Sequence, residues 1–252
     1  SLVGFNWSFG QKPDIDVITV YPTIDMILNT TDHNAYIKGY PDGTVRPAGL
    51  ITRAEVATIL YRLMKDQVKA RFDSKPTVKF SDVSSSDWYY GAVQMCAKAG
   101  IVSGYPDGSF KPNQAVTRAE FFKMVAMLYS DTLNTPITGK IFNDINGHWA
   151  EKYIERAATL GWIAGYSDGT FRPSNYITRA EAMTMINRVL CRMPQSADDL
   201  LNDMTVWPDN HPTDWHYLAV QEATNSHDFD RKGEVNEKWT KLTNGSDWRQ
   251  YQ

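Results

Sequence analysis

Apolar residues recur with helical spacing at three places along the chain. They fall at positions i, i+3, i+4 and i+7 after a Thr-Arg-Ala-Glu segment, and this spacing lines one face of an α-helix. Each Thr and the Glu three residues later match the capping box that begins a helix. The pattern predicts three helices that start at these segments and bury one face. The expected N-caps are Thr52, Thr117 and Thr178, and the apolar stripes are Val56, Ile59, Leu60 and Leu63; Phe121, Met124, Val125 and Leu128; and Ala182, Met185, Ile186 and Val189.

A second helical pattern follows three tryptophans, Trp88, Trp149 and Trp215, each preceded directly by Asp or His. That polar residue is expected to open the helix. The apolar positions that follow are Ala92 and Val93, Ile154 and Ala157, and Ala219 and Val220. Between the two patterns stands a Gly-Tyr-x-Asp-Gly loop that ends in Pro, in which Asp-Gly permits a positive φ and Pro fixes the exit. We therefore expect six main helices with projecting loops.

Both patterns belong to an internal repeat. The loop and the Thr-Arg-Ala-Glu segment, here called the back half, occur at 39–55, 104–120 and 165–181 without a gap. The tryptophan segment, called the front half, begins at Phe80, Phe142 and Trp207. The order along the chain is back, front-back, front-back, front. Because a half-repeat cannot bury its apolar face alone, we expect the last front half to pack beside the first back half and close a pseudo-threefold ring, in preference to an open array with frayed ends.

The expected fold class is all-α, with a central helix bundle. Alternation from Ile15 to Tyr21 suggests a strand or extended arm, and 66–78 and 130–140 have the composition of linkers. The missing signal peptide and the unexplained arm suggest a fragment from the C-terminal end of a longer secreted chain. The expected segments are an N-terminal arm or the end of an upstream region (1–33), the second half of repeat one (34–66), repeat two (79–130), repeat three (141–192), the half that completes repeat one (206–229) and an irregular C-terminal tail (230–252).

The repeated Gly-Tyr-Pro-Asp-Gly, Pro and Thr-Arg-Ala-Glu pattern, with an aromatic-x-Asp and a Trp upstream, resembles the S-layer homology domain over about 34–229. Ser167 replaces the loop proline in the third copy, and Trp207 replaces phenylalanine in the last front half. The resemblance implies an extracellular, noncatalytic module that anchors proteins to the bacterial cell wall. It implies grooves between repeats that bind secondary cell-wall polysaccharide, commonly through a pyruvate ketal on N-acetylmannosamine, or peptidoglycan-linked glycan. It also implies that Arg53, Arg118 and Arg179 contact the anionic ketal.

Charge and composition exclude several classes of binding partner. The chain has 252 residues and a formal net charge of −3, so no basic field attracts nucleic acid or an anionic membrane. No apolar run reaches the roughly 20 residues of a spanning helix, so membrane insertion is not expected. The two cysteines, Cys96 and Cys191, match no metal or redox motif. We expect a monomer in which the three repeats form a pseudo-trimer.

The three arginines are unusual apart from any family. A cation in the first turn of a helix opposes the helix dipole and costs a few tenths of a kcal/mol. A guanidinium beside free backbone N–H groups would nevertheless make a good receptor for a carboxylate. The alternative is that each arginine pairs internally with an acid of the aromatic-x-Asp element, namely Asp82, Asp144 or Asp209.

Aromatic residues complete the candidate site. Trp88, Trp149 and Trp215 could stack on sugar rings or fill the core, and the two interpretations are evenly weighted. Tyr40, Tyr105 and Tyr166 suit a sugar rim, although packing of their loops is the more common role.

The sequence predicts neither a metal nor another cofactor. Asp42, Asp107 and Asp168 stand in Asp-Gly turns without the alternating acids of a calcium loop. His211 and His216 are spaced i, i+5 and miss a common helix face. No catalytic motif is present, and catalytic carboxylates rarely come in threefold copies, so we expect no enzyme. The alternatives to an anchoring module are a self-assembly domain of a surface layer and, less favoured, a wall-polysaccharide hydrolase.

Overall fold

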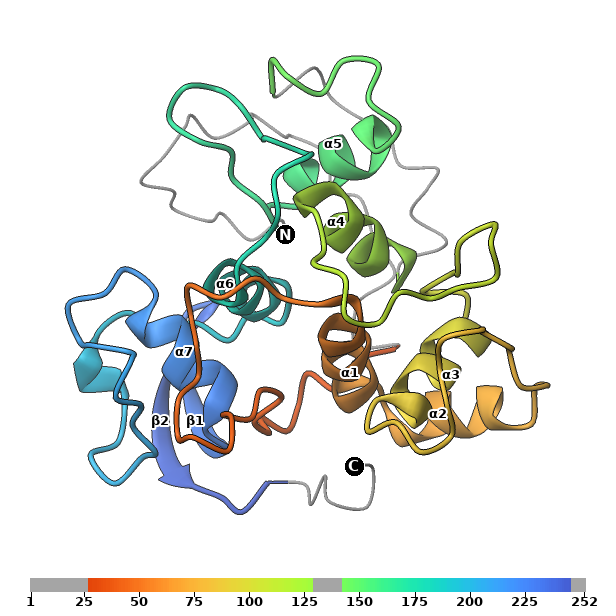
Figure 1. The fold of residues 1–252 in the computed structure, drawn as a ribbon. Coiled ribbons are helices and arrows are strands. Elements are labelled where there is room, and N and C mark those ends of the chain that lie inside the picture. Colours follow the sequence, from red (N-terminus) through yellow and green to blue (C-terminus); the bar gives the residue numbers. More distant parts are fainter. Residues whose placement is uncertain (1–26, 129–141, 246–252) are drawn as a thin grey trace.

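The structure is a computed structural model that describes residues 27–128 and 142–245 (Figure 1). The strand predicted at 15–21, the linker 130–140 and Trp248 lie outside the described residues. The elements are α1 (Arg53–Leu63), α2 (Asp66–Asp73), α3 (Tyr90–Lys98), α4 (Arg118–Ala126), α5 (Glu151–Thr159), α6 (Arg179–Val189), the 3-10 helix η3 (Ala197–Asp199), α7 (Tyr217–Thr224), β1 (His227–Lys232) and β2 (Asn236–Leu242).

The helices of the back halves begin where the sequence predicts. In α1, α4 and α6 the hydroxyl of the N-cap threonine accepts the amide of the glutamate three residues later, and the glutamate carboxylate accepts the amide of the threonine. At Thr52 these two distances are 3.3 and 2.8 Å. Both bonds satisfy amides that the first helical turn leaves without an internal partner, which is why a four-residue signal suffices to fix the start.

The helices of the front halves begin two residues later than the sequence predicts. Their N-cap positions are Tyr89, Ala150 and His216, and none of these side chains caps its helix. The carboxylate of Asp87 accepts the amide of Ser84 at 2.7 Å, and that of Asp214 accepts the amide of His211 at 2.8 Å. The acid before each of these two tryptophans therefore closes the preceding turn, and the tryptophan stands outside the helix.

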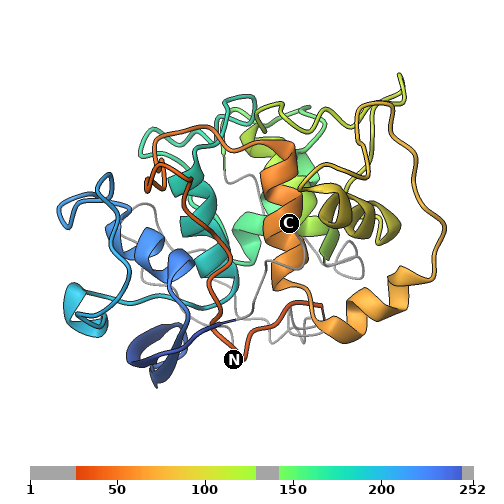
Figure 2. The same ribbon diagram turned by 60° about the horizontal axis from the view of Figure 1, so that its bottom comes forward.

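In Figure 1, α1, α4 and α6 surround the centre of the molecule, and α3, α5 and α7 lie outside them. Each outer helix packs against the inner helix that precedes it in the chain: α3 on α1, α5 on α4 and α7 on α6. The buried apolar residues of these helices form one continuous core. The back-half loops gather at one end of the molecule, and α2 and the strands lie at the other (Figure 2).

The three back halves meet in a ring of backbone hydrogen bonds. The amide of Ile51 donates to the carbonyl of Ile177 at 3.2 Å, that of Ile177 to Val116 at 3.0 Å, and that of Val116 to Ile51 at 3.0 Å. All three side chains are fully buried. Because these residues directly precede the N-caps, the ring brings the starts of α1, α4 and α6 together.

Each front half holds the loop of the back half with which it forms a repeat. Asp82 accepts the amides of Phe110 and Lys111 at 2.7 and 2.8 Å. The equivalent Asp144 accepts those of Phe171 and Arg172, and Asp209 accepts those of Val45 and Arg46 at 3.0 and 2.7 Å. The C-terminal front half therefore contacts the N-terminal back half.

The loop conformation explains why a carboxylate is needed there. Arg46, Lys111 and Arg172 have φ values of 50°, 57° and 59°, a left-handed conformation that is unfavourable for residues with a Cβ. In every copy, two backbone amides donate charge-assisted hydrogen bonds to one aspartate, and these bonds offset the strain.

The prediction of an all-α fold is wrong, and so is that of an irregular tail from residue 230. β1 and β2 form an antiparallel sheet that pairs His227 with Leu242 and Lys232 with Asn236. In β2 the buried positions alternate, but they are Glu237 and Trp239. A charged residue at one inward position hides the apolar alternation by which a strand is recognised.

The segment 66–78 is also more regular than a linker, because it contains α2. None of the residues of this helix is buried. Val68 and Phe72 pack partly against the core, and the remaining face is polar. Its polar composition therefore matches that of a linker, which explains the wrong prediction.

Candidate functional site

The three arginines of the Thr-Arg-Ala-Glu segments join neighbouring repeats. Their exposed fractions are 5% for Arg53, 3% for Arg118 and 4% for Arg179. In each, Nε donates to a loop carbonyl of another back half: Arg53 to Phe110 at 2.8 Å, Arg118 to Phe171 at 2.9 Å, and Arg179 to Val45 at 3.0 Å. The Nε group of each arginine therefore stabilises the contact between two back halves.

The helix N-termini beside these arginines do not offer the free amides that the sequence interpretation assumed. The amides of Arg53 and Ala54 donate to the carbonyls of Gln114 and Pro112 at 3.0 and 2.9 Å. The first two amides of α4 donate in the same way to the carbonyls of residues 175 and 173. The first two amides of α6 donate to the carbonyls of residues 49 and 47. These backbone amides already donate to neighbouring repeats, so any anion receptor at these sites must consist of side chains.

Two of the three arginines are paired internally, but not with the acids named from the sequence. Arg118 Nη1 lies 3.1 Å from Glu181 Oε1, and Arg179 Nη1 lies 2.8 Å from Glu55 Oε1. These glutamates are the capping-box residues of the next back half. The predicted alternative partners, Asp82, Asp144 and Asp209, instead accept the loop amides described above.

The loop tyrosines lie between two cations. The guanidinium carbons of Arg179, Arg53 and Arg118 lie 4.9, 4.9 and 5.0 Å from the ring centroids of Tyr40, Tyr105 and Tyr166, respectively. A second cation, at position 46, 111 or 172 of the same loop, approaches each ring to 3.8–4.1 Å. Burial is the largest of the causes that raise the pKa of Tyr40 and of Tyr166. The tyrosines thus stabilise the loops and position the arginines.

The surroundings of Arg53 differ from those of its two counterparts. Its Nη2 donates to the carbonyl of Ser103 at 2.9 Å. Within the described part of the chain, its Nη1 forms no hydrogen bond, and no carboxylate lies within 4.0 Å of the guanidinium. The expected partner, Glu120, bonds within its own capping box. Tyr105 also differs, because its hydroxyl accepts from Gln114, whereas those of Tyr40 and Tyr166 donate to the glutamate.

A cavity of about 280 Å³ opens at this guanidinium, and we call it the Arg53 groove. Its polar and aromatic lining is Arg53, Ser103, Tyr105, Glu120, Lys123 and Trp149. The groove therefore takes residues from all three repeats. Its volume is near the lower end of the range for small-molecule sites, about 300–1,000 Å³.

Lys123 gives the Arg53 groove a second cation. The equivalent positions in the other back halves are Thr58 and Thr184, whose hydroxyls donate to carbonyls within their own helices. Lys123 Nζ lies 5.9 Å from the ring centroid of Trp149. Two cations and one carboxylate thus face this groove, whereas arginine and glutamate neutralise each other at the other two arginines.

The three tryptophans do not fill the core, because Trp88 is 49%, Trp149 57% and Trp215 70% exposed. They present their rings to solvent at the edge of each front helix. This exposure excludes the core-filling interpretation, and sugar stacking stays a proposal.

The other candidates from the sequence have structural roles. Asp42 Oδ1 accepts the amide and the hydroxyl of Thr44, and Arg46 lies 2.9 Å from Oδ2, which together lower the pKa of Asp42 to about 2. Asp168 forms the same turn. Asp107 does so with Ser109. Asn210 Oδ1 lies 2.9 Å from His216 Nδ1, and burial lowers the pKa of that histidine. Cys96 and Cys191 are free thiols, and burial raises the pKa of Cys96 to about 12.

Comparisons with known proteins agree with the repeat pattern. Residues 16–57, 79–122 and 141–183 match the S-layer homology domain. The chain is 36% identical over 220 residues to Cell surface glycoprotein 1 of Acetivibrio thermocellus, an alignment that covers 84% of this chain and 9% of that protein. It is 37% identical over 205 residues to a Cellulosome-anchoring protein of the same organism, covering 79% and 44%.

An S-layer protein of Bacillus licheniformis is 32% identical over 165 residues, which cover 64% of this chain and 18% of that protein. The chain therefore spans less than half the length of each of these three relatives. Among the described residues, no helix combines the length and the apolar character needed to span a membrane.

Proposed function

Because the chain belongs to the S-layer homology family, we propose that it anchors an attached protein to the bacterial cell wall by holding an acidic wall polysaccharide in the Arg53 groove. The family and its surface-protein relatives indicate an extracellular module of the cell surface. We assign the module no catalytic role.

The observation that carries the proposal is that Arg53, unlike its two counterparts, has no carboxylate partner. At the two other arginines Nη1 is bound to a glutamate, whereas Arg53 lines a cavity and its Nη1 has no hydrogen-bond partner among the described residues. A buried guanidinium with a free donor is a strong receptor for a carboxylate, because hydrogen bonds to a charged partner are short and gain strength away from water. Lys123 adds positive charge at the same cavity.

The ligand that fits best is a sugar bearing a carboxylate, such as the pyruvate ketal of N-acetylmannosamine. The carboxylate would lie against Arg53 Nη1 and Lys123. The ring would lie on the exposed face of Trp149, since aromatic rings cover the apolar faces of sugars while leaving the hydroxyl groups in water. Tyr105 would complete the rim, as the sequence suggests.

The Arg118 and Arg179 sites would be weaker in this arrangement. A ligand carboxylate there must first displace Glu181 or Glu55 from the guanidinium, and a displaced glutamate in a partly buried site repels the incoming anion. Trp215 and Trp88 would then contribute less than Trp149. Tyr40 and Tyr166, which hydrogen-bond these glutamates, are correspondingly less available to a ligand.

Sedimentation with purified cell walls tests the proposal, using walls before and after chemical removal of ketal pyruvate. We expect the bound fraction to fall sharply on depyruvylated walls. Unchanged binding would point to another wall ligand, and a chain that binds no wall preparation would refute the anchoring role. Trp149→Ala should weaken binding, whereas Trp215→Ala, which removes the exposed tryptophan of another front half and does not line the Arg53 groove, is the matched control.

A self-assembly domain is the second candidate, and the three exposed tryptophans favour it as possible contacts between chains. Analytical ultracentrifugation in the absence of wall material distinguishes the two. A monomer that sediments with walls supports anchoring, and concentration-dependent association that Trp215→Ala abolishes supports self-assembly.

A further inference from the structure

Far from the Arg53 groove, two histidines and two glutamates converge inside the protein. They are His33, before the first repeat; Glu222 in α7; His227 in β1; and Glu237 in β2. All four side chains are fully buried. One ligand atom of each lies within 4.8 Å of all the others. Neither the sequence pattern nor the proposed function accounts for this cluster.

The distances in the cluster approximate the edges of a tetrahedron around a small ion. His227 Nε2 lies 2.9 Å from Glu237 Oε1 and 3.3 Å from Glu222 Oε1. His33 Nδ1 lies 3.0 Å from Glu237 Oε1 and 3.9 Å from Glu222 Oε1. A zinc ion with bonds of about 2.0–2.2 Å to nitrogen and oxygen has ligands about 3.3–3.5 Å apart in tetrahedral geometry. The cluster is thus close to a coordination shell without large movement.

Hydrogen bonding leaves a lone pair of His227 directed at this centre. Its Nδ1 lies 2.9 Å from the carbonyl oxygen of Asn225, which can only accept, so Nδ1 carries the proton. In the neutral ring Nε2 is then an acceptor, and it faces the carboxylates of Glu237 and Glu222, which are acceptors as well. Three converging acceptors need a proton or a metal cation between them. A second-shell carbonyl that fixes the tautomer in this way is common among histidines that bind metals.

The glutamates are held by groups outside the centre. Glu222 accepts Arg192 Nε at 2.7 Å through Oε1 and Trp239 Nε1 at 2.8 Å through Oε2. Glu237 Oε2 lies 3.5 Å from Arg231 Nη1. These donors fix both carboxylates and leave Glu237 Oε1 to the two imidazoles. Glu222 and Glu237 bring two negative charges to the centre, of which Arg192, 2.7 Å from Glu222 Oε1, offsets one, and the arginines lie in the outer shell that orients the carboxylates.

The histidine rings are fixed by packing. His33 stacks on Phe229 with centroids 3.7 Å apart, and His227 stacks on Trp239 at 4.1 Å.

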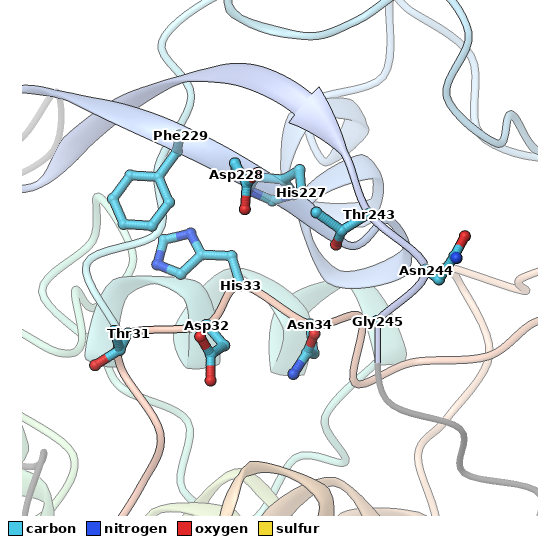
Figure 3. A pocket seen from close by; sticks show the side chains of 10 residues that line it. All are labelled: Thr31, Asp32, His33, Asn34, His227, Asp228, Phe229, Thr243, Asn244 and Gly245. Carbon is cyan, nitrogen blue, oxygen red and sulfur yellow. The ribbon is translucent and has the colours of Figure 1, made fainter.

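An open pocket of about 550 Å³ reaches the two histidines, and Figure 3 shows His33 and Phe229 in its wall. The exposed Asp32 and Asp228 also line it. The pocket borders the cluster on the side of the two histidines, and its two acids place negative charge there.

We propose that His33, Glu222, His227 and Glu237 form a site for one divalent ion of the zinc class. Two imidazole nitrogens favour zinc over Ca²⁺ and Mg²⁺, which prefer shells made of oxygen. The ion would join residue 33 to three residues of the segment 222–237, which lies far from it in sequence. It would thereby fasten the N-terminal segment to α7 and the hairpin, whose backbones already meet at the His227 amide and the His33 carbonyl, 3.1 Å apart.

Calorimetric titration of the metal-stripped chain, without a polyhistidine tag, with ZnCl₂ tests this site. We expect one Zn²⁺ per chain and a higher Tm in its presence, with no comparable response to CaCl₂ or MgCl₂. Absence of zinc binding by the wild-type chain would overturn the proposal, and a proton would then occupy the centre.

Matched variants locate the ion. His33→Gln and Glu237→Gln should weaken zinc binding by about tenfold or more, since even outer-shell changes cost about 10–100-fold. His211→Gln and Glu234→Gln make the same changes at exposed positions and should have no effect. Equal affinity in all four variants would refute the site.

If a cluster variant fails to fold, spectroscopy of the wild-type chain with Co²⁺ tests the site instead. Bound Co²⁺ should give the intense visible absorption of a tetrahedral site, and the weak spectrum of a six-coordinate ion would contradict the proposal.

Discussion

Arg179 Nη1 lies 2.8 Å from Glu55 Oε1, although the two residues are 124 positions apart. The pair joins the third back half to the first. Arg118 and Glu181 join the second to the third in the same way, whereas Arg53 and Glu120, which would complete the set, form no such pair. A chain with three nearly identical motifs therefore has two closed arginine sites and one open site.

Lys123 stands where the other two back halves have threonine, and exchanging these residues tests the role of the lysine. Lys123→Thr installs the residue found at the two equivalent positions, so we expect weaker binding to walls that carry acidic glycan, by about fivefold to tenfold, because one cation leaves the groove. The unfolding temperature should hardly change, since the Lys123 side chain forms no hydrogen bond to any residue of 27–128 or 142–245. Wall-binding isotherms at two salt concentrations measure the effect, which should be larger at low salt.

Thr184→Lys is the converse variant and places a lysine beside Arg118. Because Arg118 stays bound to Glu181, we expect little gain in wall binding. A gain equal to the loss at Lys123→Thr would show that lysine alone, and not the open arginine, determines affinity.

Removal of Arg179 should cost stability more than binding. Arg179→Ala removes the cation that pairs with the mostly buried Glu55 and the Nε donor of the Val45 carbonyl, so we expect a loss of about 3 kcal/mol in the free energy of unfolding. Urea denaturation measures it. Arg172→Ala removes an exposed ion pair with Asp168 and should cost less than about 1 kcal/mol. Similar losses for both variants would contradict the structural role of Arg179.

The junction of the chain ends depends on Asp209. Asp209→Ala removes the acceptor of the Val45 and Arg46 amides, one of which belongs to a left-handed residue, so we expect a loss of about 2 kcal/mol. Asp82→Ala should cost a similar amount, because its loop is held in the same way. Asp198→Ala, at an exposed position, is the control. Thermal unfolding that is unchanged in Asp209→Ala would refute the importance of the junction.

The turn aspartates should titrate far below an ordinary carboxyl. Hydrogen bonds from the Thr170 hydroxyl and amide, with Arg172, lower the pKa of Asp168 to about 2. The folded value is below the unfolded one, so the stabilising contribution is present above the unfolded pKa and is lost as pH falls through about 2. Thr170→Ala should raise the pKa of Asp168 toward its usual value while that of Asp42 stays at about 2. Carbon-detected NMR titration of both carboxyl groups measures this, and parallel shifts would contradict a local cause.

The starts of α1, α4 and α6 were predictable because a capping box is a local signal: Thr52 and Glu55 satisfy each other's amides within four residues. The front-half helices were placed less accurately, since Asp87 resembles an N-cap but closes a turn instead. The hairpin was missed because Glu237, an inward residue of β2, is charged. Both errors concern polar residues, but for different reasons: Asp87 forms a local turn with Ser84, whereas Glu237 is buried through contacts with His227 and the distant His33.

The sequence by itself determined the repeat, its three helix starts and the turn chemistry of its loops, because these depend on contacts over a few residues and recur in three copies. Only the tertiary structure decided which arginine faces a cavity and which is bound to a glutamate. It also decided that His33 meets Glu237 across 204 positions. Such contacts depend on how distant segments pack, and the spacing of residues along a chain holds no record of that packing.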